Sequence, residues 1–215
     1  MDEVLDVFES VNLIRKEGFR DYTILNLLYD AALRASELAE LSIESVNQKN
    51  ETVGVRGKGN KYRLVQIWPR TTQLVGRYLV EHRVVPKPLY RNRLFINQRR
   101  EGFTRHGIHR ICRKYLKKIL TEDQLKKMNS AHCFRHSCAV HMLAQVKSIS
   151  DIKNHLEHED IKTTMIYLKL DTSRKKEIQE RFIEYTKTFL KTETKIDELI
   201  DWDNKEDILN WLDSL

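Results

Sequence analysis

The sequence predicts a mainly α-helical fold with a small antiparallel β-sheet, an α+β arrangement. The first observation is that apolar residues recur at helical spacing over most of the chain. The second is that residues 51–68 change to the period of strands on both sides of a glycine-containing turn, as in a β-hairpin. The third is the length of 215 residues, with which a single domain buries roughly 70% of its unfolded surface and needs no disulfides.

Two helices open the chain. Residues 1–17 place a set of apolar side chains near one helical face: Val4, Leu5, Phe8, Val11 and Leu13. Residues 20–43 are richer in apolar residues and predict a second, more buried helix that ends near Leu41.

A hairpin and a third helix follow. Val53 and Val55 indicate one strand, and residues 64–68 indicate the next. The turn Gly57-Lys58-Gly59-Asn60 joins these strands. A helix is expected to begin at Thr71 or the residue after it and to run to about residue 83.

The middle of the chain is broken by prolines before it becomes helical again. Pro86 and Pro88 predict a loop, and residues 94–97 are a short strand candidate. Residues 103–120 predict a helix with Thr104 as its N-cap.

The C-terminal part predicts helices only. They are expected over residues 131–146, 148–158, 159–170 and 173–190. Residues 191–215 form an acidic tail that could include a short amphipathic helix.

The charge of the chain is uneven. The formal net charge is +7, but residues 190–215 hold eight acidic and three basic residues, so this segment carries −5 and residues 1–189 carry +12. A strongly basic body favours a polyanionic partner, nucleic acid first, although a merely soluble basic protein has the same composition. The helix at 103–120 shows the same ambiguity, because its Arg- and Lys-rich side is either a solvated face or a surface that touches DNA backbone.

Several classes of protein are excluded. The longest apolar runs are far shorter than the ~20 residues that span a bilayer, so no membrane association is expected. The acidic, amphipathic N-terminus is unlike a signal peptide. Three cysteines, an odd number, favour a reducing cytoplasm over a disulfide framework.

One set of residues carries chemistry when it is read in chain order: Arg34, Lys58, His132, Arg135, His158 and Tyr167. This inventory suits phosphodiester transfer without a metal or another cofactor. Two guanidinium groups can grip the non-bridging oxygens of a phosphate. A tyrosine oxygen can attack phosphorus, and lysine and histidine side chains can donate and accept the protons.

Four segments at fitting intervals resemble the tyrosine recombinases, or phage-integrase family, of the Xer-like type. They are "ALRASELAEL", "GKGNKYRLVQI", "HCFRH" and "LEHEDIKTTMIY". The resemblance extends from about residue 10 to residue 170 and implies the catalytic-domain fold of that family. Each segment alone is weak, whereas four in order are specific.

The resemblance assigns roles to the cations. Arg34 and Arg135 would clamp the scissile phosphate, and Lys58 would be the general acid for the leaving 5′ oxygen. Glu37, one turn after Arg34, either holds that guanidinium in place or forms an ordinary surface pair.

The resemblance also assigns roles to the remaining members of the set. His132 would act as acid and base near the nucleophile, and His158 would hydrogen-bond a phosphate oxygen. Tyr167 would form the 3′-phosphotyrosyl bond. His136 would be a structural neighbour.

Two positions depart from the family pattern, which commonly has glycine at both. Ala32 lies two residues before the first arginine, and Glu157 lies directly before His158. A carboxylate next to a phosphate site is unfavourable unless it points away.

A zinc site is the alternative interpretation of "HCFRHSC". His132 and His136 are four residues apart, and Cys133 or Cys138 could join them. Both thiols would face away from the histidines on a helix, and Arg135 would repel a dication. We therefore expect no metal.

The predicted organisation is a catalytic domain over residues 1–190, followed by the tail. Family members commonly carry an N-terminal core-binding domain of about 100 residues that closes around DNA, and this sequence begins almost directly at the catalytic domain. It is either a fragment of a longer integrase or naturally short, like the fimbrial-type DNA invertases.

The resemblance implies a function in site-specific recombination. Double-stranded DNA would be cleaved and rejoined through a Holliday junction in a tetrameric synapse, with self-association through the helix around 175–190. The protein would be cytoplasmic and bound to the bacterial nucleoid when on DNA. The alternatives are type IB topoisomerase-like relaxation and a non-catalytic DNA-binding regulator that keeps the fold.

Overall fold

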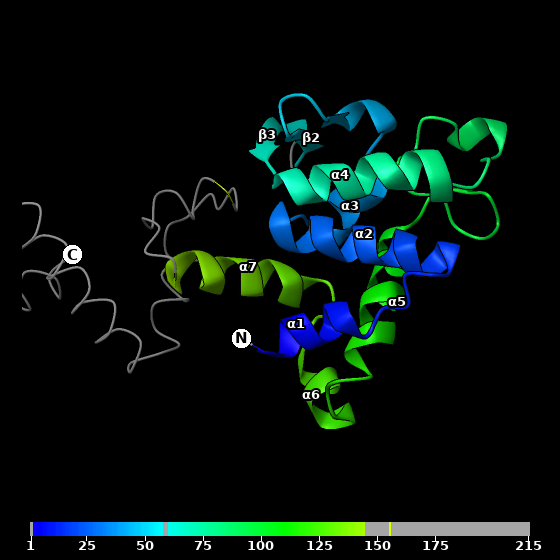
Figure 1. The fold of residues 1–215 in the computed structure, drawn as a ribbon. Coiled ribbons are helices and arrows are strands. Elements are labelled where there is room, and N and C mark those ends of the chain that lie inside the picture. Colours follow the sequence, from blue (N-terminus) through cyan, green and yellow to red (C-terminus); the bar gives the residue numbers. More distant parts are fainter. Residues whose placement is uncertain (1, 58–59, 145–154, 156–215) are drawn as a thin grey trace, which may run out of the picture. The chain divides into compact units, whose positions relative to one another are not determined.

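The computed structural model describes residues 2–57, 60–144 and 155, all within one compact unit of residues 1–167 (Figure 1). Its elements are α1 (Asp2–Glu9), α2 (Lys16–Asp30), α3 (Ala35–Glu40), the 3₁₀ turn η1 (Ile43–Ser45), β1 (Val46–Asn47), β2 (Thr52–Arg56), β3 (Tyr62–Gln66), α4 (Pro69–Arg77), the π-helical turn η3 (Tyr78–His82), the 3₁₀ turn η4 (Pro88–Tyr90), α5 (Arg105–Leu116), α6 (Glu122–Lys127) and α7 (His132–Ala144). The predicted class, mainly α with a small antiparallel sheet, is confirmed.

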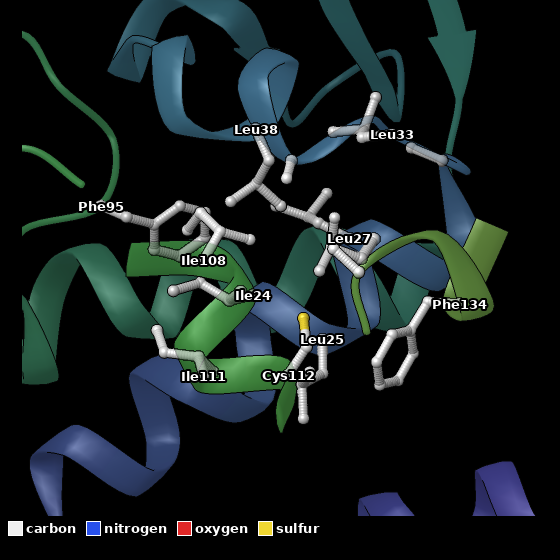
Figure 2. Packing of buried hydrophobic residues seen from close by; sticks show 14 of the residues in the cluster. Ile24, Leu25, Leu27, Leu33, Leu38, Phe95, Ile108, Ile111, Cys112 and Phe134 are labelled. Carbon is white, nitrogen blue, oxygen red and sulfur yellow. The ribbon is translucent and has the colours of Figure 1, made fainter. Parts of the chain in front are cut away.

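Helix α2 lies at the centre of the core. Ile24, Leu25 and Leu27 are fully buried although they point to different sides of the helix, as expected for a helix surrounded by others. Figure 2 shows these side chains packed among Ile108 and Cys112 of α5 and the other labelled apolar residues. Helices α3, α4 and α7 also pack on α2, so the helices that follow the sheet are fixed relative to the one that precedes it.

The N-terminal helix is shorter than predicted. It ends at Glu9 rather than near residue 17, and α2 begins at Lys16. The chain between them folds back so closely that a Cβ at Gly18 would lie 1.8 Å from the carbonyl oxygen of Asn12. Glycine is therefore required at this contact.

The prediction of one helix over residues 20–43 was wrong. Helix α2 ends at Asp30, and α3 begins at Ala35. Between them Ala32 has φ of 48°, in the left-handed region that helices do not use. The apolar pattern continues through this break because both helices and the turn are buried, so periodicity alone could not reveal it.

The sheet has three antiparallel strands in the order β1-β2-β3. The hairpin of β2 and β3 was predicted, whereas the two-residue strand β1 was not. Val53 pairs with Val65, which puts Val65 on the buried face, and Leu64 is consequently 65% exposed. Trp68, which was assigned to the strand, is the N-cap residue of α4.

The middle segment differs from prediction in two places. Residues 94–97 form no strand, because the chain there makes only isolated bridges, Ser42 to Arg93 and Ile96 to Gly102. Helix α4 begins at Pro69, two residues before the predicted start. The predicted N-cap of α5 is confirmed, since the Thr104 hydroxyl accepts a 3.2 Å hydrogen bond from the Gly107 N–H.

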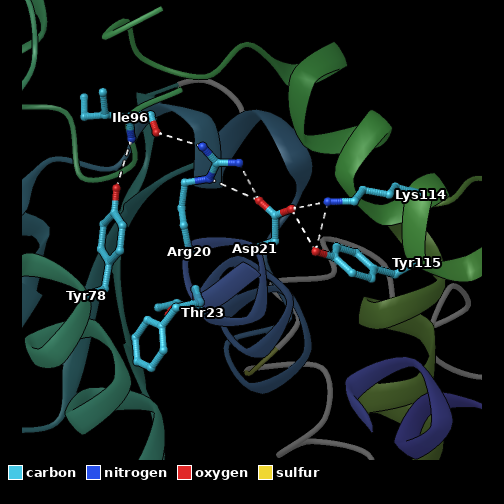
Figure 3. A network of polar contacts seen from close by, with 8 residues as sticks. Arg20, Asp21, Thr23, Tyr78, Ile96, Lys114 and Tyr115 are labelled. Carbon is cyan, nitrogen blue, oxygen red and sulfur yellow. Dashed lines mark hydrogen bonds and ion pairs between the residues drawn. The ribbon is translucent and has the colours of Figure 1, made fainter. Parts of the chain in front are cut away.

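A buried polar network fastens α5 to α2 (Figure 3). The Asp21 carboxylate is fully buried and accepts hydrogen bonds from Arg20, from Lys114 at 3.1 Å and from the Tyr115 hydroxyl at 3.0 Å. Arg20 also donates to the carbonyl of Ile96. A buried carboxylate satisfied in this way fixes the angle at which the basic helix crosses the core.

The C-terminal predictions lie largely outside the described residues. Helix α7 agrees with the predicted helix at 131–146. The elements predicted over 148–190 and the acidic tail cannot be compared, apart from His155, which is helical. No helix in the part of the chain that the structure describes is both long and apolar enough to cross a membrane.

Candidate active site

The turn between α2 and α3 is where the site begins. The left-handed conformation of Ala32 aims its carbonyl oxygen at Arg135 of α7, whose Nη1 donates a hydrogen bond of 2.6 Å. Arg135 is 1% exposed. Ala32 occupies the position where the family commonly has glycine, and its φ explains that preference, since glycine adopts this conformation without strain.

Arg34 follows directly as the N-cap residue of α3. Its Nη1 lies 2.6 Å from Oε1 of Glu37, and its backbone N–H donates to the other carboxylate oxygen at 2.8 Å. The Arg34 side chain remains 39% exposed, so a solute can reach it.

Glu37 is buried, so its contact with Arg34 is not an ordinary surface ion pair. It is 5% exposed. From β3, Arg63 donates to both of its oxygens, at 3.3 Å and 3.1 Å. Burial pushes the pKa of Glu37 upward, but the hydrogen bonds from Arg63 and Arg34 outweigh burial and hold this pKa below its ordinary value.

His132 opens α7 and is exposed. Partial desolvation lowers the pKa of His132 below its ordinary value of 6.5. Nearby positive charges act in the same direction, namely those of Arg135, His136 and Arg34. These effects favour the neutral imidazole, which can accept a proton.

The structure thus brings Arg34, His132 and Arg135 together. The other three predicted site residues, Lys58, His158 and Tyr167, lie outside the described residues. The hairpin that flanks Lys58 is closed by the Gly57 N–H, which donates to the carbonyl of Lys61 at 2.8 Å.

Sequence reasoning missed Arg63 and His155. Arg63 lies opposite Val55 in the hairpin, on the buried face of the sheet. A cation on a buried face needs an anion, and this signal was readable from the alternation of β3. Nε2 of His155 lies 2.8 Å from the main-chain carbonyl oxygen of Asp30. Because a carbonyl oxygen can only accept, Nε2 is the donor. No local sequence pattern indicates this contact.

A basic groove runs along α5. Its volume is about 540 Å³, and it is lined by His106, His109, Arg110, Arg113, Met128, Asn129 and Ser130. Within the described ranges, Arg110 and Arg113 form no ion pair, whereas Lys114 pairs with Asp21 and Lys117 pairs with Glu122. Arg110 and Arg113 therefore lie on a side of α5 that borders the segment leading into α7.

The zinc alternative finds no support among the described residues, where no group of three or more His, Cys, Asp and Glu could hold a metal. Cys133 donates its thiol hydrogen to the carbonyl of Ser130. Burial raises the pKa of the thiols of Cys133 and Cys138 to about 12. Both cysteines behave as small apolar residues, Cys138 buried and Cys133 partly buried.

Comparisons with known proteins agree with this geometry. A model described as "Phage integrase family" matches residues 1–174. The tyrosine recombinase XerD of Staphylococcus epidermidis is 31% identical over 183 residues, which are 85% of this chain and 61% of that protein. The chain thus spans about three fifths of the length of the curated relatives that it matches.

Solved structures show the same fold. The crystal structure of XerA recombinase matches with a TM-score of 0.70 and 26% identity, over 84% of this chain and 61% of that one. XerH site-specific recombinase, in a post-cleavage complex with palindromic difH substrate, matches with a TM-score of 0.68 and 23% identity, over 82% of this chain and 49% of that one. Since the family model covers most of the sequence and the fold agrees, the chain belongs to the phage integrase family, the tyrosine recombinases.

Proposed function

We propose that the chain cleaves and rejoins DNA strands in site-specific recombination, through a 3′-phosphotyrosyl intermediate at Tyr167. The observation that carries the proposal is the convergence of Arg34 and Arg135. One arginine caps α3 and the other is held by the carbonyl of Ala32, two residues before the first. This arrangement supports the proposal that both guanidinium groups bind one phosphate.

The cations supply electrostatic stabilisation. Attack on a phosphodiester adds negative charge to the non-bridging oxygens, and pre-aimed guanidinium donors stabilise that charge without reorganising. The Arg34 side chain is 39% exposed, so a phosphate can reach its guanidinium group. Arg135 is buried, and we expect the side chains that cover it to shift when the phosphate enters.

In the proposed covalent step, the Tyr167 oxygen forms a bond to phosphorus while the bond from phosphorus to the 5′ oxygen breaks. His132 accepts the phenolic proton, and Lys58 gives a proton to the departing 5′ oxygen. His158 hydrogen-bonds a non-bridging oxygen. Each proton transfer contributes typically about 10²–10⁴-fold, and the reverse sequence rejoins a strand.

Double-stranded DNA is the proposed substrate. The unpaired cations of the α5 groove match the phosphate backbone in charge, and the groove borders Ser130, two residues before His132. XerH, with which the chain shares its fold, was solved with a DNA substrate. We further propose a tetrameric synapse with a Holliday junction, on bacterial DNA in the cytoplasm, with no metal or other cofactor.

A covalent-trapping assay tests the reaction. The protein is incubated with nicked duplexes that carry candidate junction sites, and denatured samples are searched for a protein–DNA adduct. We expect an adduct from the wild type and none from Tyr167→Phe, which lacks only the attacking oxygen.

The outcomes separate the candidate functions. An adduct that forms on any duplex and relaxes supercoils would favour the topoisomerase alternative. Sequence-specific binding by the wild type without any adduct would favour the DNA-binding regulator and contradict the proposed reaction. Because the curated relatives are longer, the assay is run in parallel on any longer product of the same gene.

A further inference from the structure

Arg63 reaches the candidate active site from the inner face of the sheet. It lies opposite Val55 in the hairpin of β2 and β3, and Val65 follows on the same face two residues later. Val55 is fully buried, and the Arg63 side chain is only 12% exposed. A guanidinium group in such a place needs an anion close by, and that anion is Glu37 of α3.

The contact between Arg63 and Glu37 has two points. Nη1 of Arg63 donates to Oε1 of Glu37 at 3.3 Å, and Nη2 donates to Oε2 at 3.1 Å. Two hydrogen bonds from one planar guanidinium group fix the orientation of the carboxylate as well as its position. A lysine has a single nitrogen and cannot reproduce this two-point contact.

The same two carboxylate oxygens hold Arg34. Oε1 of Glu37 accepts from Nη1 of Arg34, and Oε2 accepts from the backbone N–H of Arg34. The Arg34 side chain is 39% exposed, compared with 12% for Arg63, so Arg34 is the arginine that a solute can reach. The carboxylate that Arg63 fixes is therefore the one that directs the accessible guanidinium group.

Arg63 also keeps Glu37 ionised. Burial raises the pKa of Glu37, and the hydrogen bonding from Arg63 is the largest of the contributions that lower this pKa. Loss of Arg63 would therefore favour the protonated carboxyl, which is a weaker acceptor for Arg34. It would also remove the hydrogen bonds that tie the carboxylate of α3 to the sheet.

We propose that Arg63 is a positioning residue, which fixes the direction of the Arg34 guanidinium group by holding the carboxylate of Glu37 in place. This inference rests on the proposed function, in which Arg34 binds the scissile phosphate. Arg63 acts through Glu37 and touches no reacting atom. Strand β3 thereby becomes part of the support of the phosphate site.

The direction of Arg34 is tested without any DNA. Relaxation of ¹⁵N in the arginine side chains gives an order parameter for each Nε–H bond, and the Arg34 signal is assigned by its loss in Arg34→Lys. We expect a rigid Arg34 side chain in the wild type, and in Arg63→Met an order parameter below about 0.6, the range of flexible groups. An Arg34 that is equally ordered in both proteins would overturn the proposal.

Binding of inorganic phosphate tests the consequence for the site. The chemical shift of the Arg34 Nε–H group is followed at pH 7 and constant ionic strength while phosphate is added. We expect the dissociation constant to rise by roughly 2- to 10-fold in Arg63→Met, because the phosphate must then order a freely moving side chain. Arg63→Lys keeps the charge but not the two-point contact, so it should fold more stably and give an intermediate dissociation constant.

The matched control is Arg20→Met. Arg20 also donates to a buried carboxylate, that of Asp21, and its side chain is 11% exposed, but it belongs to the separate network of Figure 3. We expect both methionine variants to lower Tm, whereas Arg20→Met should change the phosphate affinity of Arg34 by less than about twofold.

The outcomes separate this inference from the proposed function. Equal effects of Arg20→Met and Arg63→Met on Arg34 would show that Arg63 only stabilises the fold. If phosphate does not shift the Arg34 signal in the wild type, the role of Arg34 in the proposed function fails, and the order parameters still decide whether Arg63 directs Arg34.

Discussion

Glu37 shows how one buried carboxylate can organise a cationic site. Taking this charge out of water is unfavourable, and only the donors of Arg34 and Arg63 make the ionised form stable. The geometry also has a cost to the cations, because part of each guanidinium is committed to Glu37. The contact with Glu37 gives the Arg34 guanidinium a fixed direction, and a fixed direction favours recognition of a phosphate.

Replacing Glu37 by Gln tests this account at the level of stability. We expect the free energy of unfolding at pH 7 to fall by about 2 kcal/mol, since charged hydrogen bonds in a buried site are replaced by neutral ones. The pKa of Glu37 is lowered on folding from 4.5, so its contribution is complete above pH 4.5 and is lost as the pH falls through the lower folded pKa. Urea unfolding at a series of pH values measures the difference.

The control for this prediction is Glu81→Gln. Glu81 pairs with Arg77 on the surface, where both side chains are about half exposed, so its loss should cost less than about 0.5 kcal/mol. A difference between wild type and Glu37→Gln that does not shrink as the pH falls below 4.5 would show that the carboxylate charge is not what stabilises the site.

At the scale of elements, the turn between α2 and α3 is the feature that sequence periodicity concealed. The sequence predicted an element correctly where the stabilising contact is between near neighbours in the chain. Thr104 is an example, because its hydroxyl caps α5. The break after Asp30 has a distant cause, because the Ala32 carbonyl meets Arg135 more than a hundred residues later. The segment 94–97 likewise depends on a remote partner, because the Leu94 N–H donates to the carbonyl of Leu41.

Two glycine substitutions measure the strain in this turn. Ala31 and Ala32 are both fully buried, but only Ala32 has a positive φ. Ala31→Gly should cost about 1 to 2 kcal/mol, from the lost methyl group and the greater entropy of the unfolded chain. Ala32→Gly should cost about 1 kcal/mol less, because left-handed strain of that size is relieved.

Chemical denaturation of both variants gives the comparison, and the matched burial of the two positions removes the methyl term. Equal losses of stability would contradict a strained Ala32. We expect Ala32→Gly to fold and to keep the hydrogen bond from Arg135, since the carbonyl of residue 32 keeps its direction.

For the molecule as a whole, the sequence predicted the fold class and the hairpin, and it predicted the neighbours Arg34, His132 and Arg135. It did so because the chemistry-bearing segments recur in a known order, which is information that periodicity does not contain. Arg63, Glu37's second partner, required the pairing register of β3, and the contact of His155 required the tertiary structure. Which residues hold a site in place depends on the tertiary surroundings, so these residues are harder to predict from a sequence than residues that react.

The charge distribution of the whole molecule leads to the last prediction. The chain is basic, but cations that already pair with carboxylates release no counterion from DNA, so the contribution of α5 should come from Arg110 and Arg113. Replacing both by Gln should weaken binding to any duplex and reduce the slope of log K against log salt by about 1.8, at about 0.9 for each phosphate contact.

Lys117→Gln, whose lysine pairs with Glu122, should leave the slope nearly unchanged. Fluorescence anisotropy with a labelled duplex between roughly 50 and 200 mM salt measures both. Since phosphate contacts carry no sequence information, a duplex of arbitrary sequence suffices. Equal slopes for the wild type and the double variant would place the DNA backbone on another face of the molecule.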